Sequence, residues 1–153
     1  MGAKVTGLHI SQGGVPKDSV DYIEVKFDGC LGDRQNDLKH HGGENKAICL
    51  FQQEIIQQLN ESGHPIYPGS TGENILVSGI NIGSLRPGSI IKFANVELEI
   101  TQDASPCKTI SSSFIGGQFN LISNKLYPNF TRWYAKVNRE GSISLGESLS
   151  IIN

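Results

Sequence analysis

The chain has 153 residues and carries 13 Lys and Arg against 15 Asp and Glu, a formal net charge of −2. This near balance excludes a strongly basic nucleic-acid binder as the default interpretation, and a hydrophobic content of 37% excludes a disordered chain. The length predicts a single domain over residues 1–153. The 18 glycines exceed the roughly 7% of an average protein and predict many tight turns.

The three cysteines, Cys30, Cys49 and Cys107, are odd in number and too widely spaced for a disulfide framework or a CxxC pair. This usage is typical of a reducing compartment. The longest apolar run covers residues 47–51, far short of the ~20 residues of a membrane-spanning helix. The sequence therefore predicts a cytoplasmic protein that has neither membrane nor nucleic-acid partners.

Short runs of alternating apolar and polar residues predict strands, with turn residues between them. The predicted strands cover residues 5–10, 19–27, 47–51, 74–77, 89–93, 96–101, 143–145 and 149–152. The clearest is a hairpin of residues 89–93 and 96–101, because apolar and polar side chains alternate at every position of its second strand. The last two strands are predicted to pair with each other about Gly146.

Two helices are predicted. Residues 52–60 place Ile55, Ile56 and Leu59 on one face, and Gly63 suits the end of that helix. Residues 128–137 also place apolar side chains at helical spacing. Together these elements predict a mostly β fold, a closed or nearly closed β-barrel with two or three short peripheral helices, which leaves few exposed strand edges.

Cys107 is the first residue that could carry chemistry. It lies in the segment Ser-Pro-Cys-Lys-Thr of residues 105–109, just after a predicted strand. The adjacent Lys108 and a helix start after Cys107 would favour the thiolate, the form that soft metals and sulfur transfer require. The alternative is a buried cysteine that acts as a small hydrophobe, which is the favoured interpretation of Cys30 and Cys49.

Residues 32–46 combine charged side chains with glycines and run directly into a predicted buried strand. Gly42 and Gly43 can present backbone N–H groups to an anion. His40 and His41 suggest a metal, but adjacent histidines in an extended chain point to opposite faces, and no third ligand stands at a recognisable spacing. A solvated surface loop is the alternative. The cationic candidates for phosphate contact are Arg34, Lys39 and Lys46.

Two further segments offer polar side chains. In the turn of residues 68–75, Glu73 accepts hydrogen bonds while Asn74 both donates and accepts, which suits a heterocycle edge but equally the capping of the turn. Arg132 stands among aromatic residues and suits a phosphate or carboxylate partner. The chain has no Walker-type loop, Rossmann glycine fingerprint, nucleophile elbow or HExxH motif, which argues against nucleotide hydrolysis, dinucleotide chemistry, serine esterases and zincins.

In their order along the chain, these stretches resemble the MOSC domain family, found at the C-terminus of molybdenum cofactor sulfurases and as small free-standing bacterial proteins. The matching segments are residues 14–17, 29, 32–35, 40–47, 68–69, 71–75, 85–89, 98–101, 106–107, 132–137 and 141–150. The resemblance spans nearly the whole chain, and the ordered set is more specific than any one segment.

The resemblance implies a cofactor pocket in which Cys107, from the Pro-Cys motif, is the reactive residue. Cys107 is then expected to ligate the molybdenum of a molybdenum–pterin cofactor or to carry sulfur as a persulfide, and Asp33 to act beside it in catalysis. No pyridoxal phosphate is expected, because the chain has no aminotransferase-like domain. The residues expected to hold the molybdopterin and its phosphate are Arg34, His40, His41, Gly42, Gly43, Lys46, Glu73, Asn74 and Arg132, with Lys17 as a further phosphate candidate.

Three functions stay open at this point. A carrier would work with a cysteine desulfurase or a cofactor-biosynthesis protein. A molybdenum-dependent reductase of N-hydroxylated bases or amidoximes would need an external electron donor, because the chain has no flavin, haem or iron–sulfur motif. A non-catalytic ligand-binding β-barrel is the third. The pair Lys108-Thr109 departs from some relatives and leaves the substrate class open.

Overall fold

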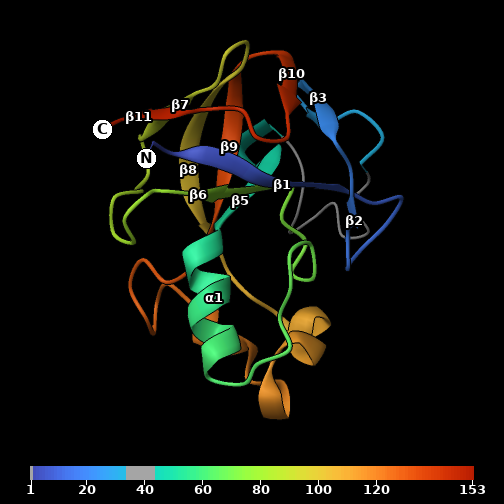
Figure 1. The fold of residues 1–153 in the computed structure, drawn as a ribbon, viewed down its shortest axis with the longest axis vertical. Coiled ribbons are helices and arrows are strands. Elements are labelled where there is room, and N and C mark those ends of the chain that lie inside the picture. The colour runs from blue at the N-terminus through green and yellow to red at the C-terminus, as the bar shows by residue number, and fades with distance from the viewer. Residues whose placement is uncertain (1, 34–43) are drawn as a thin grey trace.

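One large mixed sheet dominates the computed structural model, which describes residues 2–33 and 44–153 (Figure 1). The strands are β1 (Lys4–Ile10), β2 (Asp18–Ser19), β3 (Tyr22–Lys26), β4 (Gly29–Cys30), β5 (Ile48–Gln52), β6 (Ile75–Ser78), β7 (Ile90–Lys92), β8 (Glu97–Ala104), β9 (Arg132–Arg139), β10 (Gly141–Ser144) and β11 (Ser150–Ile152). The helices are α1 (Gln53–Glu61) and the 3-10 segments η1 (Glu44–Lys46), η2 (Lys108–Ser113), η3 (Ile115–Gly117) and η4 (Phe119–Ile122).

The main sheet has the strand order β11-β7-β8-β9-β5-β6-β1-β2, and β10, β3 and β4 form a smaller sheet. Within the described residues, β5 and β6 are the parallel pair. Parallel neighbours need a crossover connection, and α1 supplies it between the end of β5 and the start of β6. In Figure 1, α1 and the 3-10 segments η2, η3 and η4 lie together at one end of the molecule, beyond the sheets.

Two apolar cores lie on opposite faces of the main sheet. Because successive side chains of a strand point to opposite faces, Leu50 belongs to the core between the sheets, while its neighbour Phe51 joins the core under α1. From α1, Ile55, Ile56 and Leu59 join this second core. Both faces of β5 are therefore covered, and all five of its residues are buried.

Several sequence predictions are confirmed. The hairpin of β7 and β8 pairs Ile91 with Leu98, and α1 begins one residue after the predicted helix start. The mostly β class is also confirmed. The closed barrel is not observed, since within the described residues the main sheet ends at β11 on one side and at β2 on the other. The segment before β11 still lies against β1, where the Val5 N–H donates to the Glu147 carbonyl at 2.9 Å.

The predicted helix over residues 128–137 is wrong, because residues 132–139 form β9 between β8 and β5. The apolar residues at helical spacing reflect a strand that is buried on both faces, with its first four residues all buried. Backbone pairing on both sides overrides the local helical pattern. The predicted pairing of the last two strands is also wrong, since β10 pairs with β3 and β11 pairs with β7.

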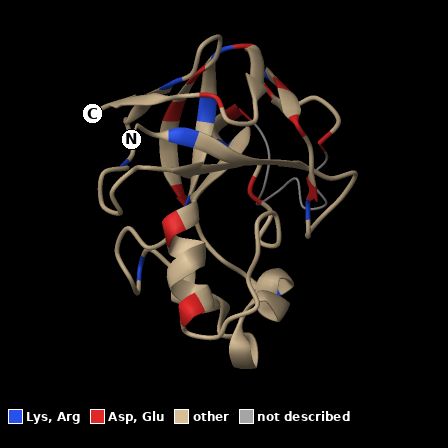
Figure 2. Ribbon diagram, viewed as in Figure 1, with Lys and Arg blue, Asp and Glu red and all other residues tan. Residues whose placement is uncertain are grey.

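Charged residues of both signs are interspersed along the strands, as Figure 2 shows. The ends of α1 are acidic, where Glu54 and Glu61 lie. Within residues 2–33 and 44–153, no helix combines the length and the apolar character that crossing a bilayer requires.

Candidate functional site

The polar residues that the sequence singled out meet where strands of the main sheet begin and end. The end of β1 lies beside the start of β6, since Leu8 pairs with Ile75. The end of β8 lies beside the start of β9, since Ala104 pairs with Arg132. Antiparallel pairing thus brings turns from distant parts of the sequence to the same region.

A buried ion pair lies at this strand-end region. Lys17 Nζ and Asp33 Oδ2 are 2.7 Å apart, and the two side chains are 3% and 4% exposed. Asp33 Oδ1 accepts the Ser11 N–H at 2.8 Å, and Oδ2 also accepts Asn74 Nδ2 at 2.9 Å. Both oxygens of Asp33 are therefore engaged, an arrangement that suits fixing Lys17 and Asn74 in place.

Asn74 joins three segments through its carboxamide, and it is fully buried. Its Oδ1 accepts the Cys49 N–H at 3.0 Å, while Nδ2 donates to the His9 carbonyl at 3.2 Å and to Asp33. A carboxamide can do this because it both donates and accepts. Asn74 therefore connects β1, β5 and the Asp33 segment from its place just before β6.

Glu73 closes the turn that precedes Asn74. Its carboxylate is fully buried and accepts the Gly69 N–H at 2.7 Å and the Thr71 hydroxyl at 2.8 Å. The Gly69 carbonyl in turn accepts the Lys17 N–H at 2.9 Å. Glu73 therefore fixes the conformation of the turn against the segment that carries Lys17, as the capping alternative predicts.

His9 lies close enough to Glu73 and Lys17 to interact with both charges, and no sequence pattern indicated it. It is 1% exposed, and its Nδ1 has no hydrogen-bond partner in the described part of the chain. A Cβ added at Gly69 would lie 2.9 Å from the His9 ring, and one at Gly7 would lie 2.8 Å from it. The close packing of Gly7 and Gly69 against the imidazole marks His9 as a residue in a tightly packed site. Local sequence patterns cannot show this packing, because Gly69 is 60 residues from His9 in sequence.

Burial lowers the pKa of His9 below its ordinary value of 6.5, and Lys17 acts in the same direction. The Glu73 carboxylate and a hydrogen bond to the Glu73 backbone raise this pKa. Asp33 is the ion-pair partner of Lys17 in the same cluster. The folded protein therefore keeps His9 neutral at a pH where the unfolded chain binds a proton. We expect the contribution of His9 to stability to be complete above about pH 6.5 and to fall as the pH falls below it.

This expectation is tested by urea unfolding of the wild type and His9→Gln between pH 7.5 and 5.5. The wild type should lose free energy of unfolding faster than the variant as the pH falls. The difference in slope is at most about 1.4 kcal/mol per pH unit, the limit for one proton. Parallel pH curves for the two proteins would contradict a neutral buried His9.

Arg132, at the start of β9, is 5% exposed. Its Nη1 donates to the Thr71 carbonyl at 2.5 Å, and its Nη2 donates to the Ala104 and Ser105 carbonyls at 3.3 Å each. The Nε atom has no partner in the described part of the chain. Thr71 lies two residues before Glu73, and Ser105 lies two residues before Cys107. Arg132 therefore bridges the segments that carry these two candidates.

Cys107 lies three residues after β8 and is half-buried. Its Sγ is 2.9 Å from Thr109 Oγ1, and its carbonyl accepts the Ile110 N–H at 3.2 Å. The predicted helix start after Cys107 is the 3-10 segment η2, whose first residue is Lys108. The thiol is thus the one cysteine sulfur among the described residues that is not buried.

Cys30 and Cys49 are buried. Burial raises the pKa of Cys30 to about 12 and that of Cys49 to about 11. A thiol that stays protonated at neutral pH is a poor nucleophile and a poor metal ligand. Their interpretation as small hydrophobes is therefore consistent with the structure.

Other candidates lie partly or wholly outside the described residues. Lys46 is half-buried in η1, with its Nζ 5.5 Å from the centroid of the Tyr134 ring. Among the described residues there is no cluster of three or more His, Cys, Asp or Glu side chains with the spacing of a metal site. The predicted site residues outside the described range are Arg34, His40, His41, Gly42 and Gly43.

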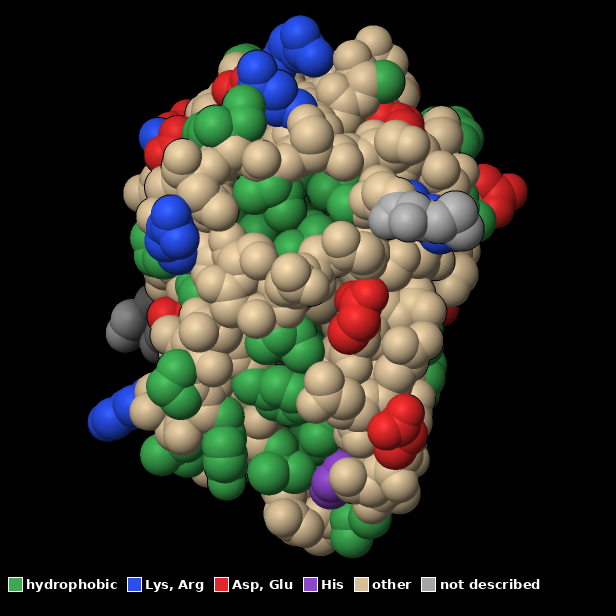
Figure 3. Space-filling model, turned by 60° about the vertical axis from the view of Figure 1, so that its left-hand side comes forward, with side chains coloured by type: hydrophobic (Ala, Val, Ile, Leu, Met, Phe, Trp, Pro, Cys, Tyr) green, Lys and Arg blue, Asp and Glu red, His purple; other side chains and the backbone are tan. Residues whose placement is uncertain are grey.

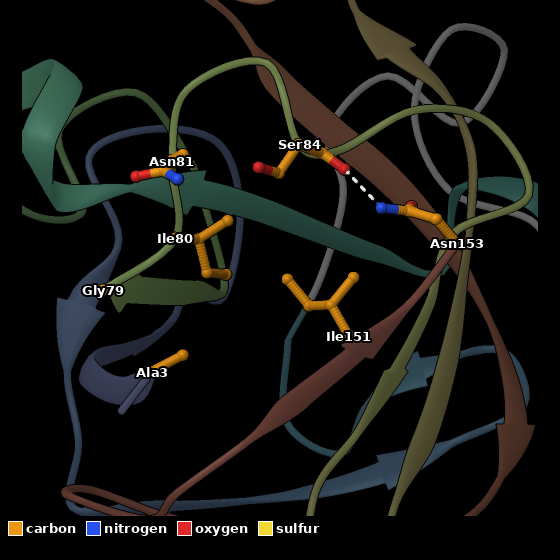
Figure 4. Close-up of a pocket in the computed structure, with 7 residues that line it drawn as sticks. All are labelled: Ala3, Gly79, Ile80, Asn81, Ser84, Ile151 and Asn153. Carbon is orange, nitrogen blue, oxygen red and sulfur yellow. Dashed lines mark hydrogen bonds between the residues drawn. The ribbon is translucent and has the colours of Figure 1, made fainter. Parts of the chain in front are cut away.

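A pocket of about 340 Å³ lies away from these residues, between β11 and the segment that follows β6. The hollowed face in Figure 3 carries hydrophobic side chains. Figure 4 shows Ile80 and Ile151 facing each other across the cavity, with Asn153 donating to the Ser84 carbonyl at 3.1 Å. The lining residues are Ala3, Gly79, Ile80, Asn81, Ser84, Ile151 and Asn153. None of the predicted site residues is among them.

These features define a mostly β domain with a buried polar centre at its strand ends and an accessible cysteine on an adjoining loop. The chain belongs to the MOSC domain family, which matches residues 37–150. The family is associated with binding of the molybdenum cofactor. The matched segment contains Cys107 and all the described site candidates except Asp33 and Lys17.

The chain is similar to YflK from Bacillus subtilis, at 27% identity over 96% of this chain, and to YiiM from Escherichia coli, at 24% identity over 82% of it. It spans 66% and 57% of the lengths of these two relatives. Among solved structures it is similar to the YuaD protein from Bacillus subtilis, with a TM-score of 0.75 and 22% identity, covering 99% of this chain and 96% of that one. This likeness supports the fold.

Proposed function

We propose that this protein binds a molybdenum–pterin cofactor or its precursor, with Cys107 as the molybdenum ligand or as a persulfide carrier of sulfur. The observation that carries the proposal is the half-buried Cys107 on a loop that Arg132 joins to the Glu73–Asn74 turn, in a chain of the MOSC family. Both roles need an accessible, soft sulfur donor.

The residues present fit such a group at its metal end. The Cys107 thiol is a soft ligand of the kind molybdenum takes from proteins, and Arg132 Nε is a buried N–H that lacks a partner in the described part of the chain. Asp33, Asn74 and Glu73 have their polar atoms engaged with protein groups. Their proposed role is to fix the pocket wall, and with it Lys17.

The phosphate end of the cofactor is proposed to bind the cations and glycine amides of the loop that the family resemblance singled out. These groups suit a phosphate because backbone N–H donors and guanidinium forks match its oxygens. Lys46 borders that loop in η1. The residues proposed for this end are Arg34, His40, His41, Gly42, Gly43 and Lys46.

In the carrier version, the Cys107 thiolate attacks the terminal sulfur of a persulfide on a cysteine desulfurase. A new sulfur–sulfur bond forms on Cys107, the sulfur–sulfur bond of the donor breaks, and the donor cysteine leaves as a thiolate. The transfer needs no outside oxidant, because one disulfide-type bond replaces another. In the reductase version, Cys107 would hold the molybdenum, which would supply two-electron chemistry. An external donor would provide the two electrons, and with two protons from solvent the N–OH group would become N–H and water.

The test is the molybdenum and pterin content of protein purified from a molybdenum-replete host that makes the cofactor. The wild type and Cys107→Ser are compared by elemental analysis and by pterin fluorescence after oxidation, with Cys30→Ala as the control thiol variant. We expect near-stoichiometric molybdenum in the wild type and in Cys30→Ala, and its loss in Cys107→Ser.

Equal molybdenum in the wild type and Cys107→Ser would contradict Cys107 as a ligand. A wild type without metal or pterin would contradict stable cofactor binding, and persulfide mass spectrometry would then test the carrier role. Incubation with a cysteine desulfurase and cysteine should add one sulfur to Cys107 and none to Cys107→Ser. Absence of this added mass would contradict the carrier role.

A further inference from the structure

The guanidinium of Arg132 contacts two loops that are far apart in sequence. Nη1 binds the Thr71 carbonyl, two residues before Glu73, and Nη2 binds the carbonyls of Ala104 and Ser105. The planar guanidinium holds its donors in a fixed fork, so the two loops are held at a fixed separation.

Cys107 follows Ser105 by two residues, and two residues of chain span at most ~7 Å. The position of the thiol is therefore restricted once the Ser105 carbonyl is fixed. Downstream, the Cys107 carbonyl accepts the Ile110 N–H and holds η2. Upstream, the fixed point is the Arg132 side chain, which belongs to a different strand.

We propose that Arg132 is the positioning residue of the Cys107 loop, and that it holds the thiol beside the Glu73–Asn74 turn. The proposal rests on the proposed function in one respect, the reactive role of Cys107. It assigns to Arg132 a task distinct from contact with a cofactor, because its Nη donors bind backbone carbonyls. Release of this contact lets residues 104–109 move as a loop.

Arg139 provides a matched control at the opposite end of β9. It also binds backbone carbonyls, donating from Nε to Asn95 at 3.0 Å and from Nη2 to Ala94 at 3.4 Å, but it is exposed. Arg132→Met and Arg139→Met therefore remove the same side-chain chemistry from the same strand. Arg132→Lys keeps the charge but lacks the planar fork, so it contacts fewer of the three carbonyls.

The experiment measures two properties of the metal-free protein at one fixed pH. One is the rate at which iodoacetamide labels Cys107, followed by mass spectrometry, and the other is amide hydrogen exchange in residues 104–113. We expect Arg132→Met to raise the labelling rate about tenfold and to speed exchange in this loop, as local opening does. Arg132→Lys should be intermediate, and Arg139→Met should stay within about twofold of the wild type.

The variant Ile91→Ala distinguishes local release of the Cys107 loop from a general loss of stability, because it removes a fully buried side chain from the core between the sheets. This variant should lower the melting temperature and leave Cys107 labelling within about twofold of the wild type. Wild-type labelling and exchange in folded Arg132→Met would overturn the proposal, as would labelling raised equally by Ile91→Ala. If Arg132→Met does not fold, Arg132→Lys provides the test. Labelling of Cys107 at the wild-type rate in Arg132→Lys would overturn the proposal, and faster labelling would support it.

Both readouts use protein without metal, so they are independent of whether the wild type binds the cofactor. A wild type that lacks both molybdenum and a desulfurase-derived persulfide would contradict the proposed function and leave the Arg132 result standing. A molybdenum-loaded wild type together with unchanged labelling in Arg132→Met would contradict only the positioning role.

Discussion

Replacement of Asp33 by alanine is expected to lower the free energy of unfolding by about 3–5 kcal/mol, the usual effect of removing one partner of a buried ion pair. The Lys17 ammonium, 3% exposed, would lose the carboxylate that lies 2.7 Å away. The Ser11 N–H and one donor of Asn74 would lose their acceptor at the same time. Urea denaturation of the wild type and Asp33→Ala measures the difference.

The matched control is Lys92→Ala, which removes one partner of an exposed pair. Lys92 and Glu97 are 4.0 Å apart, and their side chains are 51% and 31% exposed. Such pairs contribute about 0–1 kcal/mol, so the control should change stability little. The double variant Lys17→Met with Asp33→Asn should recover much of the loss, because it leaves no unpaired buried charge. An Asp33→Ala protein that is no less stable than Lys92→Ala would contradict a buried ion pair at this position.

The second large effect is expected for Gly69→Ala. Gly69 has φ +88°, and an added Cβ would lie 2.5 Å from the Lys17 carbonyl oxygen and 2.9 Å from the His9 ring. The left-handed backbone alone costs about 1–2 kcal/mol for a residue with a side chain, and overpacking adds about 1–3 kcal/mol. We expect a total loss of about 3 kcal/mol or more in the free energy of unfolding, measured by urea denaturation.

Gly88→Ala separates the two contributions. Gly88 has φ +93°, but nothing lies within 4 Å of its added Cβ. This variant should therefore show only the backbone effect of about 1–2 kcal/mol. Equal losses in Gly69→Ala and Gly88→Ala would show that the turn at Gly69 is not packed against Lys17 and His9.

Local sequence patterns predicted the elements whose partners lie nearby. The β7–β8 hairpin and α1 were found because a short turn and a one-sided apolar face are visible within ten or so residues. The strand β9 has the pattern of a helix because apolar clusters on both sides of the main sheet bury alternate side chains, Trp133 and Ala135 on one face and Tyr134 on the other. A strand that is buried on both faces lacks the alternation of apolar and polar residues by which strands are predicted.

The candidate site shows the same division. The family resemblance indicates Asp33, Glu73, Asn74, Cys107 and Arg132. The structure places Asp33 and Asn74 in direct contact, while Arg132 binds the carbonyls of Thr71 and Ser105, each two residues before Glu73 or Cys107. What each side chain contacts was not predictable, because the partners are 41 residues apart for Asp33 and Asn74 and 61 for Arg132 and Thr71. His9 was missed for that reason, since it is recognisable only from the glycines packed against it.

The late position of β9 in the chain has a consequence for biosynthesis. Without residues 132–139, the main sheet divides into β11-β7-β8 and β5-β6-β1-β2, because β9 is the strand that joins these two groups. A nascent chain that has not yet released this stretch from the ribosome cannot assemble the sheet, and Arg132 cannot yet hold the Cys107 loop. The thiol at position 107 is therefore left without the Arg132 contact until residues 132–139 have left the ribosome and joined the sheet.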